Sequence, residues 1–445
     1  MIYFTLRTLC LLFLLVFPTT SMGQEVDWKP TVGEAVGTLQ QYLRFNTTNP
    51  PGDVTGAADF LQDIFEREGI TVKRYEAAPG KINLSARLKG TGDGKPILLL
   101  HHMDVVPADA SRWDSVDPFG GEIKDGHIWG RGAIDMKGTG VLQLYAFLTL
   151  ARQKVPLNRD VIFMAVNDEE IGGTMGTRYM LDHHYDELDP EYILDEGGIG
   201  SREIFVNGKL VFGISVAEKR ALWLRLTARG IAGHGSQPHA QNPNDKLMHA
   251  LNRLFSQPFP TVPNPVLDAL VSRLGPLSPN QFTNAIRQTT VSLTSLRSGV
   301  GDPPKANVIP SLAVATLDTR LLPGMDAEAF LVEVKSRLGD EIDVEVIHPA
   351  SQSVVTPHDT AMFRALSSAI TRHHPDATVV PMIIPYGTDS RMFRLRGAKC
   401  YGILPLVLSA ELIASIHGDA ERIPVDQFET GIRIYYESLV EVATR

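Results

Sequence analysis

The stretch Val161-Ile-Phe-Met-Ala-Val-Asn-Asp-Glu-Glu-Ile-Gly-Gly173 carries the strongest indication of the fold and chemistry of this chain. Its unbroken apolar run predicts a buried strand. The run ends abruptly in acids and a pair of glycines, which predicts a turn at the edge of a sheet. Glu169 and Glu170 are therefore expected side by side at a strand end. Taken alone, such an acidic cluster is more typical of a solvated loop, so its meaning depends on the rest of the chain.

The length of the chain predicts more than one domain. It has 445 residues, whereas single hydrophobic cores stop growing at roughly 250–300 residues. An apolar content of 43% and a charged content of 21% are typical of a globular protein. The net charge is −9 and no block of Lys or Arg stands out, which argues against a nucleic-acid partner.

Residues 1–23 have the pattern of an export signal. An apolar run over residues 9–17 follows a basic residue, and Ser21-Met-Gly23 offers a cleavage site with small residues. The run is short for a membrane span, which needs about 20 residues. We therefore expect an exported protein, periplasmic or secreted, with an uncleaved membrane anchor as the alternative. Cys10 lies in this signal, so Cys400 would be alone in the mature chain, as a buried thiol without an internal disulfide.

The secondary-structure pattern predicts two domains, one inserted into the other. Helix and strand patterns alternate in the N-terminal half and again near the C-terminus, which favours an α/β sheet with helices on both faces. Between them the expected order is strand, helix, two strands, helix and strand, which is typical of a ferredoxin-like α+β unit. We expect a large domain of residues 24–215 and 349–445, with a small domain of residues 216–348 inserted. A Pro-rich segment, residues 257–277, interrupts the small domain.

His102 is a candidate metal ligand outside the opening stretch. It follows a short apolar run in Leu98-Leu-Leu-His-His-Met-Asp-Val-Val-Pro107. Asp104 lies two residues further on and faces the same way in an extended chain, so its carboxylate is a candidate to fix the histidine tautomer. The neighbouring His101 faces the opposite way and is expected to be a packing residue. Alone, His-x-Asp is more typical of a structural hydrogen bond.

Asp135 lies in a glycine-rich turn, Gly130-Arg-Gly-Ala-Ile-Asp-Met-Lys-Gly138, before a predicted helix. The turn lacks the sequence of a phosphate-binding loop and that of a dinucleotide-binding fingerprint. Asp135 is therefore interpreted as a ligand on a permissive loop, with a plain helix N-cap region as the alternative. Asp195 and His417 occupy comparable places, each after an apolar run and close to a glycine.

These candidate ligands are expected to meet, because the carboxyl ends of parallel strands lie at one edge of a sheet, where ligands bind. The set offers nitrogen and oxygen donors without thiolate, which suits zinc, manganese or cobalt. It is too large for one open tetrahedral site and suits two metals about 3.5–4 Å apart with one bridging carboxylate. The candidates are His102, Asp135, Glu170, Asp195 and His417.

Several motifs together resemble those of a known family. They are His-x-Asp-Val-Val-Pro, Gly-Arg-Gly-Ala-x-Asp-Met-Lys-Gly, Asp-Glu-Glu-x-Gly-Gly, Leu-Asp-Glu-Gly and Ile-His-Gly, in this order. The chain resembles the dizinc aminoacylase and carboxypeptidase family, and most of all the branch of carboxypeptidase S and the secreted N-fatty-acyl-amino-acid amidases. The resemblance covers nearly everything after the signal. It implies an α/β catalytic domain of the dizinc exopeptidase type with an inserted ferredoxin-like lid domain, which serves for dimerisation in dimeric relatives.

The resemblance also implies a role for each candidate. One zinc ion would be held by His102 and Asp195 and the other by Glu170 and His417, with Asp135 between them. Glu169 would be the general base beside the bridging water and not itself a ligand, and Asp104 would orient the histidine. Cobalt or manganese in place of zinc is compatible with the same donors.

Further residues of the resemblance concern the substrate. His234, in Gly233-His-Gly-Ser-Gln-Pro238, would bind the substrate carbonyl, in dimeric relatives from the lid of the partner subunit. Asn307 and Arg320 would hold the substrate carboxylate, for which a guanidinium fork is suited. A loop with Gly387 and Thr388 would close over the same carboxylate. A surface ion pair for Arg320 and a turn role for Thr388 are the alternatives, and the Pro-rich segment puts the partner role of His234 in question.

The residues and the family resemblance together predict an exo-acting amide hydrolase of the metallocarboxypeptidase or dipeptidase type, which cleaves next to a free C-terminal carboxylate. An N-acyl or N-fatty-acyl amino-acid amidase is the alternative, because the sequence does not determine the acyl side. A single-metal deacetylase would leave at least one of Glu170, Asp195 and His417 without a role. A non-catalytic exported binding protein is disfavoured because the complete ligand set and the base are present.

Overall fold

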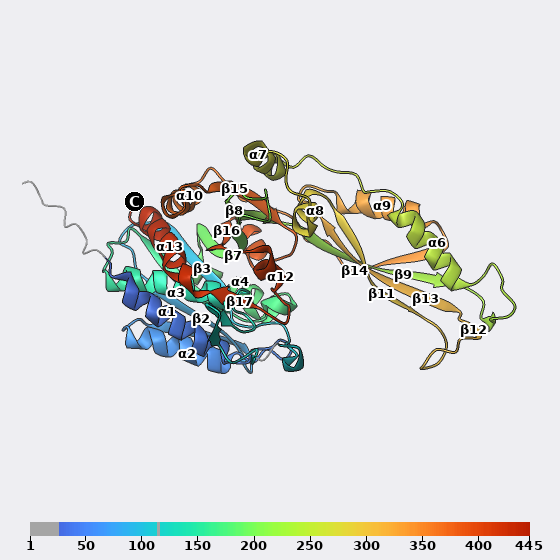
Figure 1. Cartoon of the computed structure of the whole chain (residues 1–445), viewed down its shortest axis with the longest axis horizontal. Coiled ribbons are helices and arrows are strands. Elements are labelled where there is room, and N and C mark those ends of the chain that lie inside the picture. Colours follow the sequence, from blue (N-terminus) through green and yellow to red (C-terminus); the bar gives the residue numbers. More distant parts are fainter. Residues whose placement is uncertain (1–25, 114–115) are drawn as a thin grey trace, which may run out of the picture.

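The computed structural model describes residues 26–113 and 116–445, so the predicted export signal, with Cys10, lies outside the described residues. Figure 1 shows a large α/β part and a smaller domain that extends away from it. An eight-stranded sheet lies in the large part, and a four-stranded sheet forms the smaller domain. The predicted mixed α/β fold is confirmed.

The central sheet is parallel in the middle and has antiparallel pairings towards both edges. Its strands, in spatial order, are β1 (Val72–Ala78), β2 (Lys81–Leu88), β6 (Arg159–Val166), β3 (Gly94–His102), β7 (Tyr192–Ser201), β16 (Lys399–Val407), β8 (Val211–Glu218) and β15 (Thr378–Ile384). β3 pairs in parallel with β6 and β7, and β16 continues the parallel order beside β7. β1, β2 and β6 are antiparallel neighbours. The carboxyl ends of β6, β3, β7 and β16 therefore lie at the same edge.

Alternate residues of the central strands face two separate layers. Ile97 and Leu99 pack into one apolar core, whereas Leu98 and Leu100 pack into another on the opposite face. The first core includes the helices α1 (Trp28–Leu43), α2 (Thr55–Arg67), α3 (Lys137–Arg152), α10 (Ala361–His373) and α13 (Phe428–Ala443). The second includes the short helices α4 (Tyr179–His183), α5 (Tyr185–Leu188) and α11 (Ser390–Arg394). Burial on both faces explains why these strands are apolar throughout instead of alternating.

Close packing of α3 on β3 fixes the strand that ends at the candidate site. A Cβ atom at Gly140 would lie only 2.4 Å from the His101 ring, so a larger residue would push the helix away. His101 is fully buried, and the Tyr42 hydroxyl lies 3.1 Å from its Nε2. Burial lowers the pKa of His101 to about 3. The prediction that His101 is a packing residue is confirmed.

The smaller domain has a core of its own. It consists of β9 (Arg220–Arg229), α6 (Pro243–Phe255), β11 (Thr290–Ser298), β13 (Leu312–Leu321), α9 (Ala327–Leu338) and β14 (Ile342–His348). The antiparallel order β11-β13-β9-β14 is that of a ferredoxin-like unit. Alternation along β9 places Leu222, Leu224 and Leu226 in one cluster with residues of α6 and α9. The boundaries predicted for this domain stay a prediction.

The Pro-rich segment contains a helix that belongs to the large part. Helix α7 (Pro265–Leu274) begins after Asn264, whose side chain accepts hydrogen bonds from the main chain of the first turn. Val266 and Leu270 pack into the core of the large part, where α7 contacts β15. Helix α8 (Gln281–Arg287) follows and buries Ile286 in the same core. The segment thus begins on the smaller domain, where Phe259 packs against Phe330, and continues into the large part.

The remaining elements are short. The ribbon of β10 (Gly233–His234) and β12 (Val308–Ile309) lies at the free end of the smaller domain (Figure 1). A three-stranded sheet joins β4 (Glu122–Lys124), β5 (His127–Trp129) and β17 (Arg422–Pro424). The single-turn elements are η1 (Ala110–Arg112), η2 (Glu169–Ile171), η3 (Thr174–Arg178), α12 (Ala410–Ala414) and η4 (Val425–Gln427).

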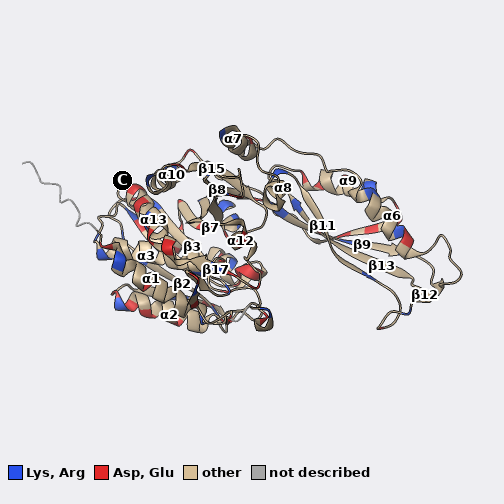
Figure 2. Cartoon of the chain, in the orientation of Figure 1, with Lys and Arg blue, Asp and Glu red and all other residues tan. Residues whose placement is uncertain are grey.

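The surface carries charges of both signs (Figure 2), and Cys400 lies in the interior. Figure 2 shows Lys and Arg interspersed with Asp and Glu along both parts. Among the described residues, none of the helices is both long and apolar enough for a membrane crossing. Cys400 is buried, and burial raises the pKa of its thiol to about 12, as expected for an inert core cysteine.

Removal of Phe163 should destabilise the large part strongly. Phe163 is fully buried, with ring centroids 5.3 Å from Phe65 and 5.0 Å from His101. Phe163→Ala should lower the free energy of unfolding by about 3–5 kcal/mol, measured by urea denaturation. The control Leu293→Ala, 42% exposed on the smaller domain, should change it by less than about 0.5 kcal/mol. Equal losses for the two variants would contradict this assignment of the core.

Candidate metal centre

The site begins where two parallel strands end at the same level. In the register of β3 and β6, His102 lies opposite Val166. β3 therefore delivers His102 to the sheet edge, and β6 delivers the turn that follows Val166. In this turn Asp168 adopts a left-handed backbone with φ of 71°, and Glu169 and Glu170 begin the η2 turn. The acids predicted at this strand end lie next to the predicted histidine.

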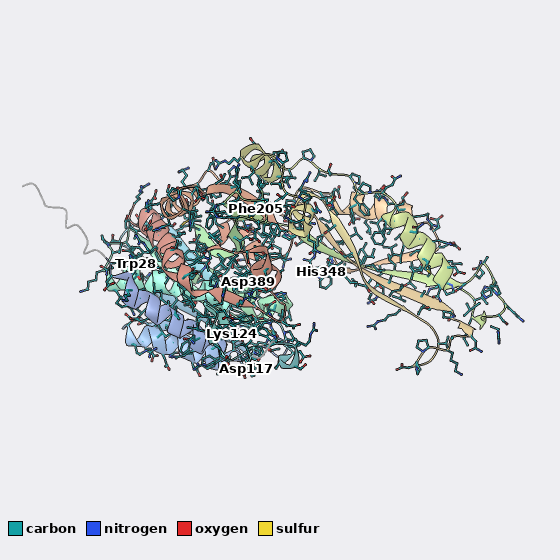
Figure 3. The ribbon with its side chains drawn as sticks, in the orientation of Figure 1. Trp28, Asp117, Lys124, Phe205, His348 and Asp389 are labelled. Atoms are coloured by element: carbon teal, nitrogen blue, oxygen red, sulfur yellow. The ribbon has the colours of Figure 1, made fainter. Side chains whose placement is uncertain are left out.

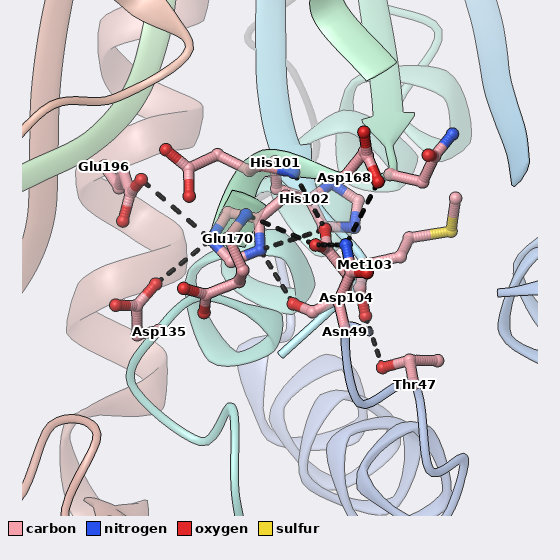
Figure 4. A network of polar contacts seen from close by, with 12 residues as sticks. Thr47, Asn49, His101, His102, Met103, Asp104, Asp135, Asp168, Glu170 and Glu196 are labelled. Carbon is pink, nitrogen blue, oxygen red and sulfur yellow. Dashed lines mark hydrogen bonds and ion pairs between the residues drawn. The ribbon is translucent and has the colours of Figure 1, made fainter. Parts of the chain in front are cut away.

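The ring of His102 is held in one tautomer by the main chain. Its Nδ1 lies 2.8 Å from the carbonyl oxygen of Asp104 and donates to it, because a carbonyl only accepts. Its Nε2 faces Asp135, whose Oδ1 lies 3.0 Å away. This is the arrangement of a histidine prepared for a metal ion, with its second nitrogen fixed by a hydrogen bond. Figure 4 shows the ring between these partners.

Asp135 lies between two histidines that are far apart in the sequence. Its Oδ1 lies 3.0 Å from His102, and its Oδ2 lies 3.0 Å from His417 Nε2. His417 also lies 3.5 Å from Glu170 Oε2. Burial alone would raise the pKa of Asp135, but hydrogen bonds to both histidines hold it well below its usual range. The hydrogen bond to Asp135 raises the pKa of His417 to about 10.

The carboxylate of Asp104 has a different role from the one predicted. It lies 3.7 Å from the His102 ring, whereas the main-chain carbonyl of the same residue makes the hydrogen bond. The carboxylate instead accepts the main-chain N–H groups of Glu169 and Glu170, at 3.2 and 3.3 Å. Asn49 donates to it as well, at 2.8 Å. Asp104 thus orients the histidine through its carbonyl and the two glutamates through its carboxylate.

Asn49, Lys81 and Asp168 support the same turn and were not predicted from the sequence. Asn49 donates to the carboxylates of both Asp104 and Asp168 (Figure 4). The Lys81 ammonium lies 2.8 Å from Asp168, and Met175 donates its main-chain N–H to Asp168 at 3.1 Å. Burial alone would raise the pKa of Asp168, but the hydrogen bond from Lys81 and the other donors lower it. The ionised Asp168 therefore anchors the turn that carries Glu169 and Glu170.

Glu169 lies half-buried among other acids. Ligand atoms of His102, Glu169 and Glu196 all lie within 4.8 Å of one another. Burial, with the charges of Asp389 and Glu170, raises the pKa of Glu169 well above its usual range, despite the opposing effect of His102. A carboxyl group with a raised pKa holds a proton more readily at neutral pH, which is what a general base requires. The predicted base therefore has a suitable environment.

Two neighbouring acids, Asp195 and Glu196, lie at the end of the strand where the sequence predicted only Asp195 as a ligand. Asp195 Oδ2 accepts hydrogen bonds from the hydroxyl and main-chain N–H of Ser390, at 2.6 and 3.0 Å. Glu196 reaches the candidate centre, with Oε1 3.9 Å from His102 Nε2. Burial raises the pKa of both carboxyl groups. The structure thus brings Glu196 into the cluster with His102, whereas Ser390 holds one oxygen of Asp195.

The donors present fit divalent metal ions. Ligand atoms of His102, Asp135 and Glu170 all lie within 4.8 Å of one another. Glu170 Oε1 is buried and has no hydrogen-bond partner among the described residues, which is costly for a carboxylate oxygen unless a cation faces it. Imidazole and carboxylate donors without thiolate suit zinc, manganese or cobalt.

The predicted substrate residues lie apart from this centre. His234 is exposed at the free end of the smaller domain, where its Nδ1 accepts from the Ser236 hydroxyl at 2.8 Å. Asn307 lies beside it and accepts the main-chain N–H of Gly235. Figure 1 shows this end of the smaller domain directed away from the large part. Within one chain, the structure does not bring His234 and Asn307 to the metal centre.

Arg320 and the 387–388 loop lie nearer to the junction of the two parts. Arg320 forms a two-point ion pair with Asp318, at 2.7 and 3.0 Å, which is the alternative left open for it. The main-chain N–H of Thr388 donates to Glu218 at 2.6 Å, and Gly387 precedes it at the same carboxylate. Figure 3 shows Asp389 in the large part and His348 at the base of the smaller domain.

A sheet edge that presents histidines and carboxylates in this way defines a metal-dependent hydrolase of the α/β class. A family model described as Peptidase family M20/M25/M40 matches residues 98–441. The chain belongs to this family, whose hydrolases depend on metal ions, and the predicted resemblance is confirmed.

Individual relatives agree with this assignment. The chain is 30% identical over 382 residues, 79% of this chain and 74% of the relative, to human N-fatty-acyl-amino acid synthase/hydrolase PM20D1. It is 29% identical over 381 residues, 77% of this chain and 70% of the relative, to a probable carboxypeptidase S-like 2 of Dictyostelium discoideum. An M20 family metallo-carboxypeptidase of Sulfolobus solfataricus has the same fold, with a TM-score of 0.69 and 20% identity, over 92% of this chain and 99% of that one.

Metal analysis of two variants should separate the roles of Asp195 and Glu196. Asp195→Ala should lose one of two bound ions, because Ser390 holds one carboxylate oxygen and leaves the other for a metal. Glu196→Ala should keep both ions. The metal content per chain is measured by elemental mass spectrometry after dialysis. The opposite result, with loss of an ion only in Glu196→Ala, would assign the ligand to Glu196.

Proposed function

We propose that the chain is an exo-acting amide hydrolase of the metallocarboxypeptidase or dipeptidase type, which uses two metal ions. The observation that carries this proposal is Asp135, whose two oxygens each lie 3.0 Å from a different histidine. A carboxylate in this position suits two metal ions that share one ligand. The names of the relatives, a carboxypeptidase and an N-fatty-acyl-amino acid hydrolase, support a substrate with a free carboxylate next to the scissile amide.

In this proposal the ligands divide between two ions. His102 and Asp195 would hold one ion, Glu170 and His417 would hold the other, and Asp135 would serve both. Zinc fits these donors, and cobalt or manganese are compatible with them. His102 is 1% exposed at its side chain and His417 is 49% exposed, so the second ion would be the more accessible.

Glu169 moves the proton in the proposed reaction. When bound, the two ions supply an activated water and polarise the carbonyl group of the scissile amide. Glu169 takes the proton of the attacking water and then gives it to the leaving amine. The hydrogen bond from its main chain to Asp104, at 3.2 Å, holds the glutamate in place for both transfers.

In this proposal the substrate is held by residues of the smaller domain together with the 387–388 loop of the large part. We propose that His234 and Asn307 act on the site of a partner subunit in a homodimer, because both lie at the free end of the smaller domain of their own chain (Figure 1). His234 would stabilise the oxyanion that develops on the substrate carbonyl. Arg320, with Gly387 and Thr388, would bind the free carboxylate, which requires the Arg320 fork to exchange Asp318 for the substrate.

The same proposal includes export. Residues 1–23 have the composition of a signal, and a periplasmic or secreted enzyme would meet small extracellular peptides as substrates. N-terminal sequencing of protein from the culture medium or periplasm would identify the cleavage position.

Two neighbouring substitutions should have different effects on metal and turnover. Glu169→Gln should keep both ions and lower kcat by about 10²–10⁴-fold, because it removes proton transfer. Glu170→Ala should lose an ion, because Glu170 Oε1 has no hydrogen-bond partner within residues 26–113 and 116–445 and is free to face a cation. Metal content and steady-state kinetics measured on the same preparations test both expectations. Unchanged turnover of Glu169→Gln would show that another group is the base.

The acyl side can be determined with two matched substrate panels. We expect faster turnover of dipeptides than of N-oleoyl amino acids, with both abolished when the C-terminal carboxylate is amidated. One observation favours the N-fatty-acyl alternative: Ile171, next to Glu170, is 54% exposed and offers an apolar contact for an acyl chain. Higher kcat/KM for the N-oleoyl panel would establish that alternative. Turnover of neither panel, in zinc- and manganese-loaded protein, would reject the proposed function.

A further inference from the structure

Arg131 and Glu421 form a buried ion pair beside the metal centre that the predicted reaction does not use. Arg131 lies in the turn that carries Asp135, and Glu421 lies shortly after His417. Their side chains are 1% and 0% exposed, and Arg131 Nη1 lies 2.7 Å from Glu421 Oε2. Neither side chain reaches solvent or substrate, so any effect of the pair on the reaction is indirect.

Main-chain pairing brings together the turn that contains Arg131 and the segment that contains Glu421. β17 pairs with β5, with Arg422 opposite Trp129. One residue beyond this pair, Gly130 donates its main-chain N–H to the carbonyl of Glu421 at 3.0 Å. The strand pairing ends there, because the glycine-rich turn leaves the sheet to carry Asp135 towards the histidines.

The Glu421 carboxylate continues the contact where the strand pairing ends. Its Oε2 accepts the main-chain N–H of Gly132 at 3.1 Å. Its Oε1 accepts those of Ile134 and Asp135, at 2.8 and 3.1 Å. The carboxylate therefore fixes the main chain of the residue whose side chain lies between the two histidines.

The Arg131 guanidinium holds the main chain of His417 and Gly418. Its Nη2 donates to the main-chain carbonyls of His417 and Gly418, at 3.1 and 2.8 Å. The planar fork of an arginine can serve Glu421 and both carbonyls at once, which the single ammonium of a lysine cannot do in the same geometry. His417 has a left-handed backbone with φ of 60°, so its placement depends on such external contacts.

These contacts form a closed ring of interactions. Glu421 holds the main chain of Asp135, Arg131 holds the main chain of His417, and Arg131 and Glu421 hold each other. The contact between His417 Nε2 and Asp135 Oδ2, at 3.0 Å, completes the ring of interactions. We propose that Arg131 and Glu421 are positioning residues that set the separation of Asp135 and His417 and thereby the affinity for the metal ion on His417. This inference rests on the proposed two-metal function.

Stability alone is a weak explanation for this pair. A buried ion pair is often replaceable by apolar residues without loss of stability. Here the donors and acceptors around the pair are the main-chain groups of two proposed ligand residues, which indicates a geometric role. Groups that orient metal ligands typically change metal affinity by about 10–100-fold when they are removed.

Three variants separate the geometric role from a general loss of folding. Arg131→Met with Glu421→Gln removes the pair without leaving an unpaired charge. Arg131→Lys keeps a positive charge for Glu421 but gives up the contacts to His417 and Gly418. The control, Arg87→Met with Asp160→Asn, removes an ion pair of 2.5 Å between β2 and β6, away from both turns.

Two measurements are made on the full-length protein. Titration of metal-free protein with zinc, followed by calorimetry, gives the affinity of each equivalent. Amide hydrogen exchange of the metal-free protein, read on peptides that cover residues 130–137 and 414–421, reports the coupling of the segments without any metal or activity.

The first two variants should bind the weaker zinc equivalent about 10–100-fold less tightly, with the other equivalent less affected. Exchange should rise in both segments even when only Arg131 is changed to Lys. The control should match the wild type in both measurements. Unchanged exchange, or an equal loss of both equivalents, would overturn the inference. A wild type that binds fewer than two ions would reject the proposed function instead, and the exchange result would still decide whether the pair couples the segments.

Discussion

Mutual repulsion between buried carboxylates is the constraint on which the arrangement of this chain depends. Burial raises the pKa values of Glu169, Asp195, Glu196 and Asp389, and the neighbouring acids contribute to several of these shifts. Free side chains would turn away from one another into water. They remain together because the strands that deliver them are packed on both faces, so the sheet holds the charges at its edge. A divalent cation between them would offset the repulsion, which explains why a stable fold can retain so many acids in one place.

The sequence was most informative where a residue's place follows from a strand. His102 and Glu170 were predicted from apolar runs that end in polar residues, and the register of β3 and β6 places these ends at one level. The first helix begins at Trp28, because Asp27 accepts a hydrogen bond from the main chain of Lys29 and so caps it.

Residues that act through long-range hydrogen bonds left no signal in the sequence. Asn49 and Glu421 have neither periodicity nor motif spacing to mark them, and each acts on a segment distant in the chain. The spacing of His102 and Asp104 predicted on which side the Asp104 side chain lies. It could not predict that the main-chain carbonyl of Asp104 would be nearer to the His102 ring than the carboxylate is. Helix α7 had a readable signal in Asn264 and Pro265, a cap followed by a proline at the first helical position. We did not predict this helix, because the high proline content of the surrounding segment is typical of a loop.

The two histidines at Asp135 come from very different depths of the structure. His102 ends a central strand and is fixed by the core, whereas His417 lies on a half-exposed turn close to the C-terminus. The last donor along the sequence therefore comes from a segment that follows the final strand of the central sheet. A nascent chain that ends at β16 contains the acids and His102 but lacks both His417 and the core helix α13. Translation must therefore pass His417 before one chain holds every proposed ligand.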